Sequence, residues 1–126
     1  MTNELYNAGQ QKRTQVMGNA LANSEAEDPH DIVKTMQSFA IEWCWGAIWT
    51  RDGLADKERS MINIAMMIAL NRSIELEGHM RGALRNGVTP EEIREIILQA
   101  AVYCGAPAGG EASRVARKVL LDHNQP

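Results

Sequence analysis

The fold of this chain is decided by one stretch, Met61-Ile62-Asn63-Ile64-Ala65-Met66-Met67-Ile68-Ala69-Leu70. The stretch is apolar nearly all round, and Asp56 before it can cap a helix that runs from about Lys57 to Leu70. Such a helix has to be covered on several sides. In a chain of 126 residues one of those covers can be another subunit, so the sequence predicts a homo-oligomer.

A second helix is expected directly after this stretch. Asn71-Arg72-Ser73 interrupts the apolar run, and Ser73 starts a helix that continues to Leu84 or Arg85. The helix stops at Asn86-Gly87, because glycine adopts the left-handed conformation that ends helices.

Two more helices follow toward the C-terminus. Thr89-Pro90-Glu91-Glu92 is a capping box with proline at the first helical position. The helix that it opens carries one apolar stripe, made of Ile93, Ile96, Ile97, Ala100, Ala101 and Cys104. Gly105-Ala106-Pro107 closes that helix and starts a final amphipathic helix that ends near His123.

The N-terminal part is also expected to be helical. A first helix is predicted from Glu4 to Leu21, and Asp28-Pro29 begins another. The second of these has its apolar residues at helical spacing, namely Ile32, Met36, Phe39 and Trp43. Core positions are the default for Trp43 and Trp49. With no convincing strand or repeat, the sequence predicts an all-α fold of about six helices in a single domain over residues 1–126.

Composition excludes several classes of function. The net charge of −3 and a pI of about 5.6 disfavour a general nucleic-acid or anionic-membrane binder, which needs a basic face. We expect a cytoplasmic protein, since no apolar run has the length of a membrane span and the first residues lack a signal-peptide pattern. Cys44 and Cys104 are expected to be reduced thiols in the core, because neither belongs to a Cys-x-x-Cys motif.

The strongest candidate for chemistry is the pair of Glu75 and His79. Their i,i+4 spacing puts both side chains on one helix face, and the imidazole leans back toward the carboxylate. A buried carboxylate can hold an imidazole in one tautomer and tune its pKa for proton transfer. The alternative is an exposed pair that only stabilises the helix. A metal site is disfavoured, because zinc needs three or four protein ligands and this pair supplies two.

Other side chains are candidates for binding a substrate. Any of four arginines could hold a carboxylate in a bidentate pair, or could form surface salt bridges instead: Arg51, Arg59, Arg72 and Arg81. The tryptophans of residues 43–49 could line a ligand cavity, although core packing is the default for them.

Taken together, these motifs resemble the carboxymuconolactone decarboxylase family, within the alkyl hydroperoxidase D-like superfamily. The resemblance spans Tyr6 to Leu120 and depends on the order of six motifs, which are Trp45-Gly46-Ala47-Ile48-Trp49-Thr50-Arg51-Asp52-Gly53-Leu54, Arg59-Ser60, Ala69-Leu70-Asn71-Arg72, Glu75-Leu76-x-x-His79, Asn86-Gly87-Val88-Thr89-x-Glu91-Glu92-Ile93 and Tyr103-Cys104-Gly105-Ala106-Pro107-Ala108. A related peroxidase branch carries Cys-x-x-Cys near the position of His79, and this sequence does not.

The resemblance implies a small helical subunit that forms a trimer or hexamer and works without an added cofactor. The reaction implied is loss of carbon dioxide from γ-carboxymuconolactone to give β-ketoadipate enol-lactone, a step of protocatechuate degradation in the β-ketoadipate pathway of aromatic catabolism. His79 is then the proton donor and Glu75 its orienting base. The candidate substrate-binding residues are Arg51, Arg81, Tyr103 and Trp45.

The sequence departs from the family pattern at Pro107-Ala108-Gly109-Gly110-Glu111, which places an extra carboxylate near the expected pocket. A second acid there could repel a polyanionic substrate. The competing hypothesis is therefore a non-catalytic helical oligomer or a ligand-binding paralogue of the same family.

Overall fold

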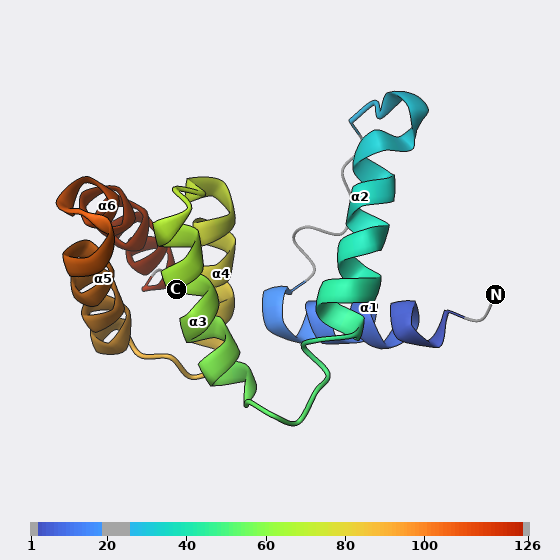
Figure 1. Ribbon diagram of the computed structural model, residues 1–126, viewed down its shortest axis with the longest axis horizontal. Coiled ribbons are helices and arrows are strands. Elements are labelled where there is room, and N and C mark those ends of the chain that lie inside the picture. The colour runs from blue at the N-terminus through green and yellow to red at the C-terminus, as the bar shows by residue number, and fades with distance from the viewer. Residues whose placement is uncertain (1–2, 19–25, 125–126) are drawn as a thin grey trace. The chain divides into compact units, whose positions relative to one another are not determined.

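The computed structural model describes residues 3–18 and 26–124. Every regular element within these ranges is helical, which confirms the all-α prediction (Figure 1). The α-helices are α1 (Glu4–Met17), α2 (Ile32–Ala40), α3 (Asp56–Ala69), α4 (Ser73–Arg85), α5 (Pro90–Cys104) and α6 (Ala106–His123), with a 3-10 turn η1 (Pro29–Asp31) and a π-helical segment η2 (Ile41–Gly46). None of the helices described is both long and apolar enough to cross a membrane.

The chain packs as two compact units, Met1–Leu54 and Ala55–Pro126. The expectation of a single domain stays a prediction. Each unit has its own core of buried side chains, so the two are described separately.

In the first unit, α1 crosses η2 at very short range. A Cβ atom on Gly9 would overlap the carbonyl oxygen of Ile41, and one on Gly46 would overlap that of Leu5. Two glycines therefore allow the two backbones to approach. Beside this crossing, Trp45 and Trp49 stack with ring centroids 4.7 Å apart and form a small core with Val16.

Two predicted helix ends in this unit are displaced. The helix α1 ends at Met17 because Gly18 has φ 75°, and the predicted end at Leu21 lies outside the described residues. At the next helix, the Asp28 carboxylate accepts hydrogen bonds from the backbone N–H groups of Val33 and Lys34, at 2.9 and 2.8 Å. The α-helix thus begins at Ile32 and not at Pro29.

The prediction that Trp43 lies in the core is wrong, since 49 % of its surface is exposed, whereas Trp49 is buried as predicted. The π-helical segment explains the difference. A wider turn changes which residues share a face, and here Trp45, two positions after Trp43, takes the buried position.

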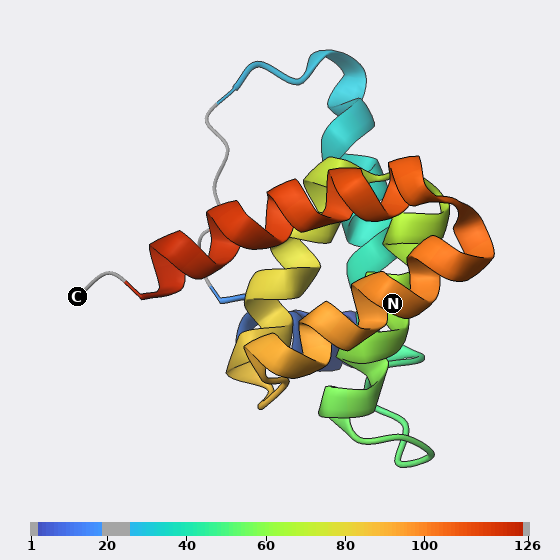
Figure 2. The ribbon, with the colours of Figure 1, turned by 90° about the vertical axis from the view of Figure 1, so that its left-hand side faces the viewer.

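The second unit is a four-helix arrangement in which α6 lies across α4 and against α5 (Figure 2). Its core is built from one apolar stripe per helix, represented by Ile64, Met80, Ile93 and Val119, each of which is 0–1 % exposed. The helix α3 is not covered on all sides, because Ile62 and Met66 are each 44 % exposed.

The predicted boundaries of α4, α5 and α6 are confirmed. Gly87 has φ 90° just beyond α4, and the capping box at Thr89 is complete: Glu92 N–H donates to Thr89 Oγ1 at 3.0 Å, and Thr89 N–H donates to Glu92 Oε1 at 2.9 Å. Asp56 was expected to cap α3, but it is the first helical residue, and the cap position belongs to Ala55.

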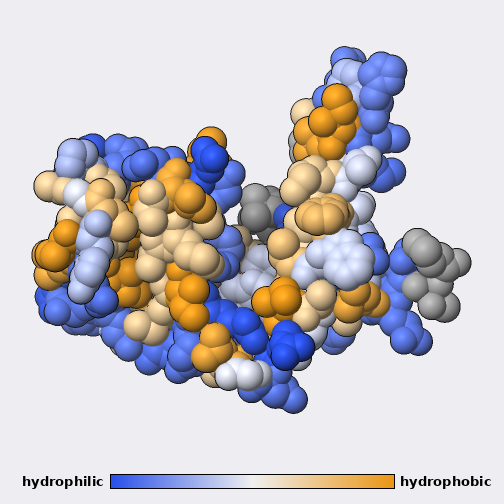
Figure 3. Space-filling view, in the orientation of Figure 1, coloured by the Kyte–Doolittle hydropathy of each residue, from blue (hydrophilic) through white to orange (hydrophobic). Residues whose placement is uncertain are grey.

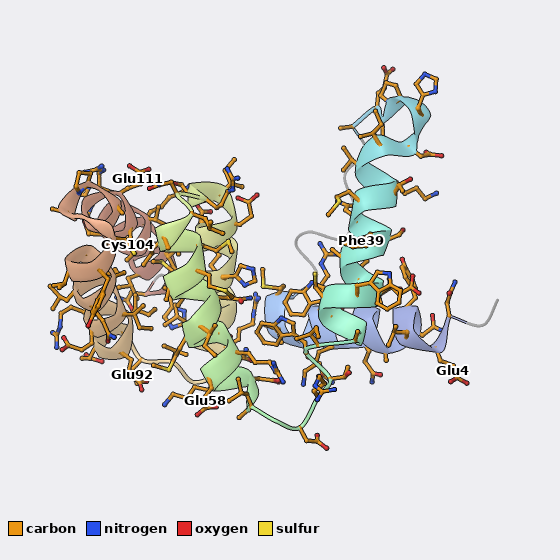
Figure 4. All side chains as sticks on the ribbon, viewed as in Figure 1. Glu4, Phe39, Glu58, Glu92, Cys104 and Glu111 are labelled. Atoms are coloured by element: carbon orange, nitrogen blue, oxygen red, sulfur yellow. The ribbon has the colours of Figure 1, made fainter. Side chains whose placement is uncertain are left out.

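Both cysteines are free thiols, as predicted, but the prediction that they are buried is wrong. Cys104 lies at the last turn of α5 and is exposed (Figure 4). The preceding residue, Tyr103, is also exposed.

Candidate functional site

Glu75 and His79 lie on α4, one turn apart. Ser73 starts this helix, so Glu75 falls in its first turn, where the partial positive charge of the helix N-terminus favours a carboxylate. Glu75 is exposed, whereas His79 is half-buried. Of the two side chains, the Glu75 carboxylate is therefore accessible to solvent, and the His79 imidazole is partly shielded from it.

The sheltered imidazole is contacted by α3. Asn63 Nδ2 lies 3.5 Å from His79 Nδ1, a long hydrogen bond between two half-buried side chains that are 16 positions apart. Asn63 was not predicted from the sequence as a site residue. The sequence does contain a feature that points to it, because Asn63 is the polar residue within the apolar run of Met61 to Leu70.

A second polar pair links the same two helices. Asn86 Nδ2 donates a hydrogen bond of 2.9 Å to Ser60 Oγ, and Ser60 is only 1 % exposed. We call the four residues Ser60, Asn63, His79 and Asn86 the polar seam between α3 and α4. Ser60 and Asn63 are one turn apart on α3, whereas His79 and Asn86 are two turns apart, with Asn86 directly after the end of α4.

The pKa of His79 is lowered from its ordinary value of 6.5 by burial, and the negative charge of Glu75 partly offsets this. Burial acts this way because a charged imidazolium loses water solvation. At neutral pH the side chain is therefore a neutral imidazole, able to accept a proton on one nitrogen and donate one from the other.

Arg81 is engaged away from His79. Two positions further along a helix correspond to a rotation of about 200°, which turns Arg81 toward the opposite side of α4. There its guanidinium donates to Asp122 on α6 at 2.9 Å and to Glu77 at 3.3 Å, and both carboxylates, Asp122 first, raise the pKa of Arg81. Its predicted role in substrate binding stays a prediction.

Tyr103 lies beside an open apolar groove of about 460 Å³ between α3 and α5. Tyr103 is 82 % exposed, and Ile62 and Met66 line the same groove from α3. The space-filling view shows apolar residues gathered over these two helices (Figure 3). Asn63, the residue of α3 that contacts His79, is not among the residues that line this groove.

The remaining two candidates belong to the first unit. Arg51 is exposed, and Trp45 is buried against Trp49. A core position for Trp45 agrees with the default interpretation of the tryptophans, and its role in binding a substrate stays a prediction.

Glu111, the extra carboxylate of the sequence, lies on α6 near the start of α4 (Figure 4). It accepts hydrogen bonds from Arg114 at 3.0 Å and from Ser73 at 3.1 Å, and these partners, Arg114 first, lower its pKa. The charge of Glu111 is therefore balanced by a neighbouring cation, which weakens the expectation that it repels an anionic substrate.

Among the residues that the structure describes, no three His, Cys, Asp or Glu side chains come close enough together to hold a metal ion. The expectation of a reaction without metal or cofactor stays a prediction.

Comparison with known proteins identifies the family. The family model described as "Carboxymuconolactone decarboxylase family" matches residues 35–118, which include α3, α4 and the whole polar seam. The chain belongs to this family. The resemblance read from the sequence motifs is thereby confirmed.

Two relatives are decarboxylases by name. The 4-carboxymuconolactone decarboxylase of Acinetobacter baylyi is 38% identical over 93% of this chain and 87% of its own length. A nitrosuccinic acid decarboxylase of Metarhizium robertsii is also 38% identical, over 94% of this chain and 82% of its own length. An uncharacterised 15.0 kDa protein of Paracoccus denitrificans is 26% identical over 91% of this chain.

The family and the two relatives that are named as decarboxylases show that the chain is an enzyme of the carboxy-lyase type, as the sequence predicted.

Proposed function

We propose that this protein is a cofactor-free decarboxylase that converts γ-carboxymuconolactone, or a related carboxylated unsaturated lactone, to β-ketoadipate enol-lactone and carbon dioxide. The observation that carries the proposal is a half-buried imidazole, His79, held in the polar seam one turn after Glu75. The 38% identity to a 4-carboxymuconolactone decarboxylase over nearly the whole chain supports the choice of substrate.

The chemistry explains why an imidazole is needed. When the C–CO₂⁻ bond breaks, its electron pair stays on the organic fragment and is delocalised into the unsaturated lactone, where it places negative charge on oxygen. The enzyme has to stabilise that charge and then deliver a proton to carbon. A single residue can deliver this proton if it is in its protonated form while the substrate is bound.

His79 meets this requirement through the signs of its pKa shifts. Burial keeps the imidazole neutral in the empty site, while Glu75 acts in the opposite direction. A substrate with carboxylates adds further negative charge nearby and favours the imidazolium. We propose that His79 takes up a proton when the substrate binds and gives it to carbon after carbon dioxide has left, with Glu75 stabilising the charged form.

The substrate-binding roles of Arg51, Arg81, Tyr103 and Trp45 remain part of the proposal. For Arg81, binding a substrate carboxylate would mean exchanging its present ion pairs with Asp122 and Glu77 for a new one. Arg51 is exposed and so is the more accessible of the two arginines.

A second substrate class is favoured by a specific observation, the equal identity to the nitrosuccinic acid decarboxylase. Nitrosuccinic acid and a carboxylated lactone share one chemical property. In each, the electron pair left by carbon dioxide can be delocalised into a neighbouring electron-withdrawing group, so the same proton donor serves both.

We further propose that the protein is a homo-oligomer, a trimer or a hexamer. Support comes from the incompletely covered helix α3 and from the apolar groove that it forms with α5. Burying such a surface against another subunit removes apolar area from water. Light scattering coupled to size-exclusion chromatography measures the mass in solution, and a monomeric mass would contradict this part of the proposal.

The enzymatic proposal is tested by measuring carbon dioxide release from γ-carboxymuconolactone and from nitrosuccinic acid. The variant His79→Gln should lose activity by about 10²- to 10⁴-fold, the usual contribution of a general acid or base. His123→Gln is the matched control, because His123 is an exposed histidine at the end of α6. Release of carbon dioxide by folded His79→Gln at the wild-type rate would overturn the mechanism.

No turnover of any carboxylated lactone or nitro acid, with no change in the His79 NMR signals when they are added, would favour the non-catalytic alternative. A response of His79 without turnover would instead indicate a ligand-binding paralogue.

A further inference from the structure

Asn63 is a polar residue at a half-buried position of the apolar helix α3. It interrupts an apolar run on α3, in which neighbouring Ile64 is fully buried, and it is itself half-buried. A polar amide at such a position forgoes apolar packing and costs stability unless it makes a hydrogen bond. The partner that the structure gives it is His79 Nδ1.

We propose that Asn63 is a positioning residue that holds His79 in the neutral tautomer with its proton on Nε2. The reasoning is from donors and acceptors. The amide nitrogen Nδ2 of Asn63 can only donate, so the nitrogen that it faces must accept, and a neutral imidazole that accepts at Nδ1 carries its hydrogen on Nε2.

This inference deepens the proposed function and rests on it for its catalytic consequence. Nε2 is then the ring nitrogen that Asn63 does not contact. When His79 takes up a proton, Nδ1 also carries a hydrogen, so the Asn63 amide has to turn its acceptor oxygen Oδ1 toward the ring. The contact is long at 3.5 Å, as catalytic hydrogen bonds often are before substrate binds. Asn63 therefore acts through His79 and does not itself react.

The rest of the polar seam supports a positioning role. Ser60 and Asn86 form a direct hydrogen bond of 2.9 Å between the same two helices. Ser60 precedes Asn63 by one turn of α3, so its bond to Asn86 links the two helices close to the contact between Asn63 and His79. Asn63 is carried by a helix, and side chains on helices are positioned more precisely than side chains on loops.

The experiment reads the tautomer directly. Two-bond ¹H–¹⁵N NMR spectra of uniformly ¹⁵N-labelled protein distinguish a protonated from an unprotonated ring nitrogen, and the His79→Gln spectrum assigns the signals. At a pH where His79 is neutral, wild type should show Nε2 protonated and Nδ1 unprotonated. A wild-type ring with its proton on Nδ1 would overturn the inference without any variant.

Two substitutions sharpen the test. Asn63→Leu keeps a similar volume but removes the donor, so both tautomers should become populated. Asn63→Asp replaces the donor with an acceptor, so the proton should move to Nδ1. Glu58→Gln is the control, because it changes an exposed side chain of the same helix and should leave the tautomer unchanged. A tautomer unchanged in both Asn63 variants, with folding verified by circular dichroism, would contradict the inference.

Turnover provides a separate readout. If the proposed function holds, Asn63→Leu should lower kcat by about 10-fold or more with little change in KM, because the ring that delivers the proton is no longer held in position. If no substrate is turned over by wild type, the proposed function fails while the tautomer measurement still decides whether Asn63 positions the ring.

Discussion

Arg81 donates a hydrogen bond of 2.9 Å to Asp122, 41 positions later in the chain, and so ties α4 to the end of α6. The same guanidinium nitrogen lies 3.3 Å from Glu77, whose other oxygen accepts from Lys118 of α6 at 2.9 Å. Two cations and two carboxylates thus form a network at the surface of the second unit. A network of this kind holds helices together more than single exposed pairs do.

The first prediction concerns this network. Arg81→Met should lower the free energy of unfolding by less than about 1 kcal/mol, because the partners are partly exposed and water screens their attraction. The loss should shrink at high salt. Urea unfolding at low and high salt measures it. Unchanged stability together with a several-fold higher KM would instead support the sequence-based prediction that Arg81 binds a substrate carboxylate.

The second prediction concerns Glu75→Gln. The charge of Glu75 raises the pKa of His79 against the larger effect of burial, so its removal should lower that pKa further. An NMR titration of the His79 ring measures this. Glu58→Gln is the matched control, since Glu58 is an exposed acid in the first turn of α3 (Figure 4) and should leave the titration unchanged. A pKa of His79 that rises or stays constant in Glu75→Gln would show that the two groups do not interact.

The third prediction concerns stability against pH. Because the pKa of His79 is lower in the folded protein than its ordinary 6.5, the unfolded chain binds the proton first as the pH falls. The contribution of His79 to stability is therefore complete above pH 6.5 and is lost as the pH falls toward the folded pKa. Urea unfolding from about pH 8 to pH 5 should show a smaller decline for His79→Gln than for wild type. A decline of equal size in both proteins would contradict the shift.

The fourth prediction concerns the start of α5. Thr89→Ala removes the side chain that accepts from Glu92 N–H and should cost about 1 kcal/mol of stability. Thr89→Ser keeps the hydroxyl and should cost much less. Thermal unfolding of the three proteins compares them, and equal losses for both variants would mean that the methyl group, not the cap, matters.

The fifth prediction uses two adjacent glycines of α6. A Cβ atom on Gly109 would lie 2.6 Å from the Cβ of Ala101 on α5, so Gly109→Ala should destabilise the protein by about 1–3 kcal/mol. Gly110 is the matched control: its nearest neighbour would be a flexible Arg114 nitrogen at 3.9 Å, and Gly110→Ala should stabilise by up to about 1 kcal/mol. Equal effects of the two changes in urea unfolding would show that α5 and α6 do not pack as described.

The sequence predicted best where a structural feature depends on neighbouring residues. The capping box at Thr89 and the end of α4 before Gly87 each depend on only a few consecutive residues, and both predictions are confirmed. Prediction was poorer where packing decides. Trp43 and Cys104 both fit an apolar helical stripe, yet both are exposed, because which face is covered depends on elements far along the chain.

For the candidate site, the sequence by itself determined that Glu75 and His79 share one face of a helix, since 3.6 residues per turn requires it. Only the tertiary structure showed that Asn63 faces His79 from α3 and that Arg81 is paired with Asp122. The physical reason is distance along the chain. Backbone geometry relates residues one turn apart, whereas contacts between residues 16 or 41 positions apart exist only after the helices have packed.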